Sequence, residues 1–312
     1  CILRACGIVG AIKIGEEVHI EVKKRGLLDK DVVLGTSLID MYGKCGALVK
    51  AQTVFDGLPL RSLSSWNVLI SGYVQQGRGD ESLNCFQRMQ REGLSPNSIT
   101  FLCVLKACGV IGAIDKGRKI HEEIIGKGFL GMDIVLDTAL VDMYARCGSL
   151  TRAQEVLKDL SLRNVVSWNA LISGFAQQGQ SEEALNCFKQ MQSEGILPNA
   201  VTFLCVLNAC SHSGLVNEGQ MYFTIMSEKY GIIPSLKHQA CMVDLFCRAG
   251  SFDKSIAVIR DMPFYADLTL WLTLLGACKK WGNVNIGVLA FDKAIKLDVK
   301  DASAYLLMNS IY

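Results

Sequence analysis

The 312-residue sequence lacks an excess of either charge, since 32 Lys and Arg residues stand against 30 Asp and Glu for a formal net charge of +2. This balance means that the protein as a whole has no strong positive electrostatic potential, so any nucleic-acid binding has to come from a local groove. The sequence also lacks an apolar run of transmembrane length, because charges or glycines interrupt every candidate. It begins at Cys1 with no signal or transit segment, which predicts a fragment and leaves its localisation open.

The motifs of common enzyme classes are also missing. The sequence contains no CxxC pair, Walker loop, strand-linked GxGxxG or nucleophile elbow. Zinc deaminases combine H-x-E with P-C-x-x-C. Here His19 and His121 each begin an H-x-E, but they stand 102 residues apart in equivalent predicted helices. Metal ligands must converge on one ion, which a linear array does not allow. We therefore predict no catalytic residue, no metal site and no cofactor.

The 13 cysteines are spread over the sequence and recur at a fixed step. Four pairs are 102 residues apart: Cys45 with Cys147, Cys85 with Cys187, Cys103 with Cys205, and Cys108 with Cys210. Cysteines tied to a repeat are more typical of small core residues than of metal ligands or disulfides. A reducing compartment suits them best.

Longer segments repeat at the same step. They are 38–46 with 140–148 and 242–250, 65–72 with 167–174, and 103–108 with 205–210. Each block of 102 residues divides into three units with one plan: an apolar-periodic helix, a glycine, a second amphipathic helix and a breaker. Sustained period-two runs and Asn-Gly hairpins, which signal strands, are missing. The sequence thus predicts an all-helical repeat protein.

The unit 165–199 illustrates this plan. Trp168 and Phe175 fall at helical spacing on one face, and Gly179 is placed to end the first helix in the left-handed conformation. In the equivalent earlier unit, Asp80 is the expected N-cap of the second helix. A hairpin of about 35 residues cannot bury its apolar face alone, so we expect the units to stack into a solenoid.

The unit lengths rotate in the order long, short, standard. The motifs include "LIDMYGKCG" at 38–46, "WNALISGFAQQG" at 168–179 and "VLNACSHSGLVNEG" at 206–219. This combination resembles the PLS subclass of the plant pentatricopeptide repeat (PPR) family over essentially the whole chain. Tetratricopeptide repeats are the nearest confusable group, but they keep a constant period of about 34 residues.

The resemblance implies a repeat array over 1–267 and a truncated E-type extension over 268–312. The array units are 1–31 (partial long), 32–62 (short), 63–97 (standard), 98–133 (long), 134–164 (short), 165–199 (standard), 200–235 (long) and 236–267 (last short). The implied fold is an all-α, right-handed superhelical solenoid of helix-turn-helix repeats. Such proteins bind single-stranded RNA in mitochondria or chloroplasts, one unit per nucleotide, without a membrane or a small-molecule substrate. Members with the E extension typically select cytidines for C-to-U editing, which implies a deaminase-bearing partner.

In this family the fifth and last residues of a unit read one base. The corresponding pairs are Thr36 with Ser62, Asn67 with Asn97, Thr138 with Asn164, and Asn169 with Asn199; the last short unit offers Asp267 alone, beside Ala240. The long units carry Leu102 and Leu204 at the fifth position, which cannot hydrogen-bond a base, so we expect them to act as spacers. The alternative for the polar residues is a helix-capping role in solvent. Their recurrence at one position favours base contact.

The resemblance assigns two further sets of residues. The second residue of a unit flanks the base, which gives Val33, Ser64, Val135 and Val166. Lys44, Arg146 and Arg248 recur at the 102-residue step and match a phosphate-contacting position, with a solvated basic residue as the alternative. Trp66 and Trp168 lie on the apolar stripe, so we predict that they are core residues and not stacking platforms.

Hydrogen-bond chemistry predicts the bases. Cytosine N3 and adenine N1 are acceptors and suit an Asn amide, whereas uracil N3–H and guanine N1–H are donors and suit a carboxylate. By resemblance, Asn at the fifth position goes with pyrimidines and Thr with purines, so unit 165–199 should prefer cytosine and unit 134–164 adenine. Two other functions stay open: a factor for RNA stability, processing or translation, and a protein-binding helical scaffold.

Overall fold

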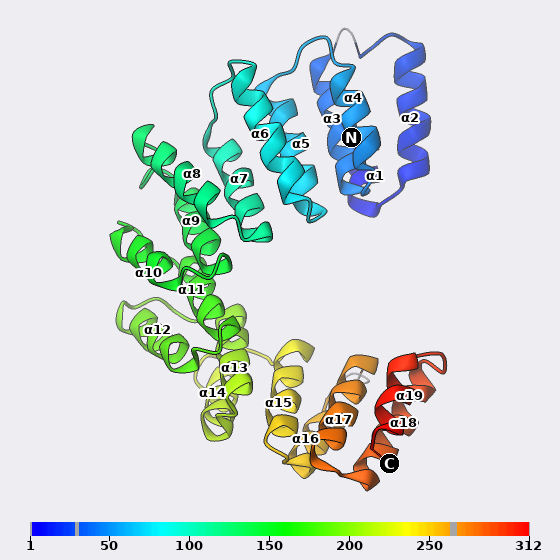
Figure 1. Ribbon diagram of the computed structural model, residues 1–312, viewed down its shortest axis with the longest axis vertical. Coiled ribbons are helices and arrows are strands. Elements are labelled where there is room, and N and C mark those ends of the chain that lie inside the picture. The colour runs from blue at the N-terminus through cyan, green and yellow to red at the C-terminus, as the bar shows by residue number, and fades with distance from the viewer. Residues whose placement is uncertain (1, 29–30, 263–266, 312) are drawn as a thin grey trace. The chain divides into compact units, whose positions relative to one another are not determined.

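The computed structural model describes residues 2–28, 31–262 and 267–311, and all regular structure within these ranges is α-helical (Figure 1). The chain forms two compact units, Cys1–Arg163 and Asn164–Tyr312. The predicted all-α fold of helix-turn-helix repeats is confirmed, because the helices follow one another as pairs joined by tight turns. In the described part of the chain, no helix combines the length and the apolar character needed to cross a membrane.

The helices of the first compact unit are α1 (Ile2–Val9), α2 (Ile12–Lys24), α3 (Val32–Lys44), α4 (Leu48–Asp56), α5 (Leu63–Gln75), α6 (Gly79–Arg91), α7 (Ser98–Ile111), α8 (Ile114–Gly126), α9 (Ile134–Arg146) and α10 (Leu150–Asp159). Those of the second are α11 (Val165–Gln177), α12 (Ser181–Ser193), α13 (Ala200–Ser213), α14 (Val216–Glu228), α15 (Leu236–Arg248), α16 (Phe252–Arg260), α17 (Leu268–Trp281), α18 (Val284–Leu297) and α19 (Ala302–Asn309). Odd-numbered helices are called first helices below, and even-numbered ones second helices.

The division into an array and a C-terminal extension stays a prediction. Helix pairing continues across residue 267, since α17 and α18 form a pair like those before them. Residues 1, 29–30, 263–266 and 312 of the predicted units lie outside the described residues.

A glycine with positive φ closes the turn between the two helices of a pair. Gly46 and Gly148, one repeat step apart, have φ of 75° and 79°. Behind Gly46 the N–H of Ala47 donates to the carbonyl of Tyr42 at 2.9 Å, which satisfies a free carbonyl at the end of α3. Gly179 ends α11 with φ of 71°, as predicted from its position.

The predicted N-cap of α6 is wrong. Arg78 is the N-cap residue, and Asp80 lies in the first turn of the helix. The turn at Gly77, which has φ of 72°, starts the helix before the aspartate is reached. The carboxylate of Asp80 still lies near the positive end of the helix dipole.

The core forms where one pair meets the next. Trp66 of α5 is fully buried and packs edge-on against Phe55 of α4, with ring centroids 4.4 Å apart. In the second unit Phe203 of α13 packs against Phe188 of α12 at 5.7 Å. Each second helix thus covers the first helix that follows it, which is how stacked repeats bury a continuous core. The predicted core positions of Trp66 and Trp168 are confirmed, with 0% and 2% exposure.

The described cysteines are free thiols, and most of them are buried. Burial raises the pKa of Cys108 and Cys210 to about 12, so both thiols stay protonated at neutral pH. The predicted role as small core residues is confirmed at such buried positions, which include Cys103 and Cys205.

Candidate nucleic-acid interface

The predicted base-reading residues lie at the N-terminal ends of first helices. In the first compact unit α1, α3, α5, α7 and α9 pack in order, each against the next, and in the second α11, α13, α15, α17 and α19 do the same. The second and fifth residues of a helix are one turn apart and share a face. Each compact unit therefore carries a row of helix N-terminal turns with candidate side chains at equivalent places.

The last residue of each predicted unit is the N-cap of the following first helix. The side-chain acceptors and backbone donors are Ser62 with Ser65 at 3.2 Å, Asn97 with Thr100 at 2.9 Å, Asn164 with Ser167 at 2.8 Å, Asn199 with Thr202 at 3.0 Å, and Asp267 with Leu270 at 3.0 Å. The capping alternative is thus observed at every one of these positions. Any base contact has to use the atoms that the cap leaves available.

Two of the predicted pairs are in direct contact. Asn67 Nδ2 donates to Asn97 Oδ1 at 3.2 Å in the first compact unit, and Asn169 Nδ2 donates to Asn199 Oδ1 at 3.3 Å in the second. The oxygen of each last residue therefore serves both the cap and the fifth residue. Among the described residues, none accepts a hydrogen bond from Nδ2 of Asn97 or Asn199. The cap thus orients each amide with its donor group unused.

Thr100 also belongs to the first of these networks and was not predicted. It is fully buried, and its hydroxyl lies 2.7 Å from Asn67 Oδ1 and 2.9 Å from Asn97 Oδ1. Its counterpart Thr202 lies 3.1 Å from Asn199 Oδ1, while Asn169 Oδ1 is buried without a partner in the described structure. The spacing Asn-x-x-Thr, which matches a capping box, was the available sequence signal.

The threonines at the fifth position bond to their own helices. Thr36 donates to the carbonyl of Val32 at 2.8 Å, and Thr138 donates to that of Ile134 at 2.7 Å. The hydroxyl proton is thereby used, and the oxygen of Thr36 is left as an acceptor. Thr138 and Asn164 belong to different compact units, so their pairing stays a prediction.

A pocket of about 340 Å³ opens where the last short unit has an alanine at its fifth position. Its polar and small lining residues include Asn208, Lys237, Ala240, Cys241, Asp267 and Thr273. The sequence predicted Asp267 as the sole polar group here. Asn208 and Thr273 reach the pocket from the neighbouring first helices α13 and α17. The sequence did not indicate them, because neither is the fifth or the last residue of the unit.

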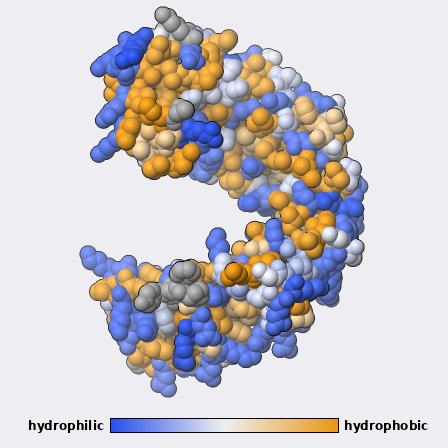
Figure 2. All heavy atoms as spheres, turned by 180° about the vertical axis from the view of Figure 1, so that it is seen from behind, coloured by the Kyte–Doolittle hydropathy of each residue, from blue (hydrophilic) through white to orange (hydrophobic). Residues whose placement is uncertain are grey.

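The predicted base-flanking residues are exposed. Val33, Val135 and Val166 show 74%, 54% and 56% exposure, and Ser64 is exposed as well. Two second residues of long units, Ile99 and Val201, were not predicted but show 55% and 53% exposure. Apolar side chains reach the surface among hydrophilic ones (Figure 2). Single exposed apolar residues are common in proteins, and at these positions they leave an apolar surface on which a base can stack.

The predicted phosphate contacts are ion-paired within their own helices. The pairs are Lys44 with Asp40 at 2.5 Å, Arg146 with Asp142 at 2.8 Å, and Arg248 with Asp244 at 2.8 Å. Pairs of this i,i+4 type at a surface are worth about 0.3–0.5 kcal/mol, so a phosphate group can displace the aspartate. The aspartates were not predicted, although their constant spacing of four residues is visible in the sequence.

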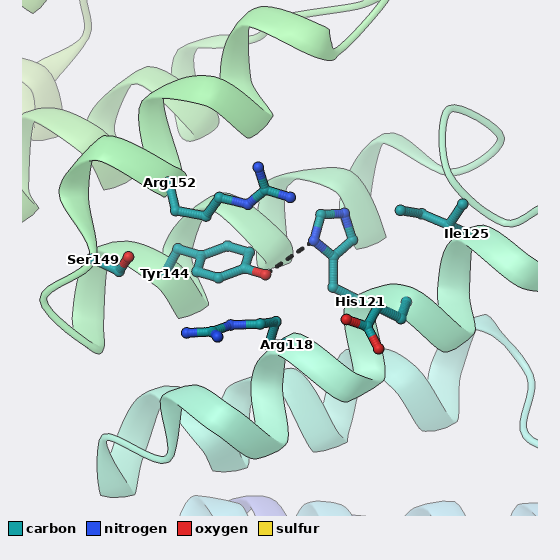
Figure 3. A pocket seen from close by; sticks show the side chains of 7 residues that line it. Arg118, His121, Ile125, Tyr144, Ser149 and Arg152 are labelled. Atoms are coloured by element: carbon teal, nitrogen blue, oxygen red, sulfur yellow. Dashed lines mark hydrogen bonds between the residues drawn. The ribbon is translucent and has the colours of Figure 1, made fainter.

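The two histidines of the H-x-E segments serve packing contacts. His19 Nδ1 lies 2.9 Å from the hydroxyl of Tyr42, and His121 Nδ1 lies 3.0 Å from that of Tyr144 (Figure 3). Burial, followed by the positive charge of a neighbouring basic residue, lowers the pKa of both imidazoles. Within the described ranges, no three His, Cys, Asp or Glu side chains are grouped to hold a metal ion.

Two models of one family match the chain. The model described as "PPR repeat family" matches residues 61–109 and 163–212, and the model described as "PPR repeat" matches 36–61, 138–165, 201–230 and 241–264. Together the matched segments include more than half of the chain.

Curated relatives from Arabidopsis thaliana match over the whole chain. A putative pentatricopeptide repeat-containing protein is 37% identical over 311 residues, which is 100% of this chain and 42% of the relative. A relative named as mitochondrial is 38% identical and one named as chloroplastic is 38% identical; this chain covers 56% and 42% of them. The chain therefore spans about half the length of the curated relatives it matches.

Solved structures show the same fold. The crystal structure of the pentatricopeptide repeat protein PPR10 in complex with an 18-nt psaJ RNA element has a TM-score of 0.71 at 16% identity, covering 95% of this chain and 47% of that one. PPR10 from maize has a TM-score of 0.63 at 20% identity, covering 99% and 51%. With the two family models matched along its helix pairs, the chain belongs to the pentatricopeptide repeat family.

Proposed function

We propose that the chain is the RNA-reading part of a plant organellar protein of the PLS subclass, which binds single-stranded RNA and selects sites for C-to-U editing. The observation that supports this most directly is the pair of Asn–Asn contacts, at Asn67 with Asn97 and at Asn169 with Asn199. Both place an unused amide donor at the start of a first helix, at equivalent repeat positions.

The chemistry of one position illustrates the proposal. A base at unit 165–199 lies between the exposed side chains of Val166 and Val201. Nδ2 of Asn199 donates to an acceptor on the base edge, which cytosine N3 and adenine N1 supply. The buried Asn169 holds Asn199 Oδ1 from behind and fixes the direction of the donor. Asn at the fifth position goes with pyrimidines in the family that the sequence resembles, so we expect cytosine to be the preferred base, with uracil tolerated.

The finer parts of the proposal have separate support. The rotation of unit lengths and the E-type resemblance of 268–312 favour editing, with the deaminase supplied by a partner. Relatives named as mitochondrial and chloroplastic favour an organelle. The fold is shared with a protein crystallised in complex with RNA, which favours RNA as the ligand.

A filter-binding comparison tests the proposal. The chain is expected to retain a single-stranded RNA and to bind the same sequence in a duplex at least about tenfold more weakly, because base edges are accessible only in the single strand. Equal binding of both forms, or none, contradicts the proposal and favours a protein-binding scaffold. A role in RNA stability, processing or translation uses the same binding, so sequencing organellar transcripts from plants without the protein separates it from editing.

The salt dependence of binding tests the basic residues. Replacing Lys44, Arg146 and Arg248 together with Ala is expected to flatten the slope of log K against log salt by about 2, since each phosphate contact on a single strand contributes about 0.7. Binding titrations across a range of salt concentrations measure this slope. An unchanged slope would show that these three residues do not contact the phosphates of the RNA.

The aspartates supply a matched control for that experiment. Replacing Asp40, Asp142 and Asp244 with Asn frees the same three basic side chains and removes three negative charges near the RNA. This variant should bind more tightly and with a steeper salt slope than the natural sequence. If both triple variants weaken binding alike, the change reflects altered helix packing.

A further inference from the structure

Another pocket lies in the compact unit Cys1–Arg163, away from the predicted base-reading positions. It has a volume of about 340 Å³ and lies between α8, α9 and α10 (Figure 3). The residues that matter are Arg118, His121 and Glu122 of α8, Tyr144 of α9, and Ser149 and Arg152 at the start of α10. The base-reading candidate of the same pair, Thr138, lies near the opposite end of α9.

The floor of the pocket is a fixed pair of aromatic side chains. His121 and Tyr144 are 5% and 1% exposed, and Tyr144 hydroxyl lies 3.0 Å from His121 Nδ1. Arg152 lines the same pocket beside this aromatic floor. Burial, and then the charge of Arg152, lower the pKa of His121, which favours the neutral ring.

Comparison with the other two repeat blocks shows that two cations at positions 118 and 152 are unusual. The same two positions in the three blocks hold Glu16 with Lys50, Arg118 with Arg152, and Gln220 with Lys254. In the first block the pair forms an ion pair of 2.5 Å, and in the third a hydrogen bond of 3.1 Å. Side chains at these positions can thus reach a common point. In the second block both are cations, and neither neutralises the other.

The ion-pair partners of the two arginines are exposed acids on their own helices. Arg118 lies 3.8 Å from Asp115, and Arg152 lies 2.8 Å from Glu155, with all four side chains at least half exposed. Glu122 lines the pocket and is exposed. Such surface pairs contribute little and exchange readily, so both guanidinium groups are available to a competing anion. The three acids limit the affinity and make it sensitive to salt.

We propose that this pocket binds a phosphate group between Arg118 and Arg152, with the hydroxyl of Ser149 as a neutral donor. The donors come from α8 on one side and from the start of α10 on the other. A tetrahedral anion has oxygens on both sides, whereas a carboxylate is satisfied by a single guanidinium fork. The ligand is inorganic phosphate or the phosphate of a nucleoside monophosphate. The site is independent of RNA reading.

Calorimetric titration with inorganic phosphate, at constant ionic strength in chloride, tests the site. One phosphate is expected per chain, with saturable binding. Arg118→Glu should weaken it at least about tenfold, because it recreates the acid–base pair of the first block. A urea midpoint that is unchanged or higher shows that this exposed position leaves the fold intact. The absence of saturable binding, or equal binding by Arg118→Glu, overturns the proposal.

The first block offers a gain-of-function variant. His19 and Tyr42 already form the same aromatic floor there, with the hydrogen bond at 2.9 Å. The double change Glu16→Arg and Ala47→Ser supplies the missing cation and hydroxyl, so the stoichiometry should rise from one phosphate to two. A stoichiometry that stays at one would contradict the role given to the two cations. Titration with a nucleoside 5′-monophosphate identifies the source: tighter binding than phosphate selects the nucleotide, and equal binding selects the free ion.

Discussion

Replacing Asn199 with Asp is expected to move the base preference at unit 165–199 from cytosine toward uracil. The change turns the unused donor into an acceptor, which suits uracil N3–H. A well-placed polar pair is worth about 1–3 kcal/mol against the wrong base, so the ratio of the two affinities should shift by about 5- to 150-fold. Titrations against RNAs that differ at one nucleotide measure this ratio.

The fold should tolerate this change. Asp267 already caps α17 through the same bond, at 3.0 Å, that Asn199 makes to α13. Asp and Asn cap helices about equally well, and Asp also suits the helix dipole. Asn97→Asp should give the same shift at its own nucleotide, and Asn164→Asp a shift from adenine toward guanine. If Asn199→Asp loses affinity equally for all four bases, the residue serves only the cap.

Replacing Trp66 with Ala should cost about 3–5 kcal/mol of unfolding free energy, the usual range for removing a large core aromatic. Trp66 is fully buried between Phe55 and the guanidinium group of Arg88, whose carbon lies 5.4 Å from the ring centroid. It joins the pair α3–α4 to the pair α5–α6. Hydrogen exchange should therefore show lost protection in α4, α5 and α6, because repeat stability depends on contacts between neighbours.

Replacing Trp66 with Phe keeps most of the ring volume and removes the indole N–H, so it tests the two contributions separately. The indole Nε1–H is buried with no hydrogen-bond partner in the described ranges, so losing it removes a desolvation cost. This variant should be clearly less destabilised than Trp66→Ala in urea unfolding. Val49→Ala, at a side chain of α4 with 77% exposure, should change the unfolding free energy by less than about 0.5 kcal/mol. Equal losses for Ala and Phe at position 66 would mean that the indole group itself is required.

The helix pairs were predictable because their signals are local. An apolar period, a glycine after the first helix and a capping residue before the next recur along the sequence, and the structure uses them. The N-cap of α6 was mispredicted for a local reason too, since the turn geometry at Gly77 outweighs the capping preference of Asp80. A propensity is a weak constraint where the backbone turn already fixes the start of the helix.

The candidate site was predictable only in part. The positions of Asn169 and Asn199 follow from the repeat, but their contact joins residues 30 apart and depends on how two helices pack. The pairing of Lys44 with Asp40 was visible as an i,i+4 spacing and was overlooked. Only the structure shows that Arg118 and Arg152 line the same pocket. The repeat then allows the comparison with the ion pair of Glu16 and Lys50.

The N-caps have a consequence for the evolution of this protein. Under the proposed function, the residue that reads a base is also the residue that starts a helix, as Asn199 does for α13. Asn, Asp, Ser and Thr are all good caps, so exchanges among them alter recognition at little cost in stability. Asn and Asp codons differ by a single transition. A drifting organellar target could therefore be followed one nucleotide at a time through folded intermediates, without a compensating change elsewhere in the chain.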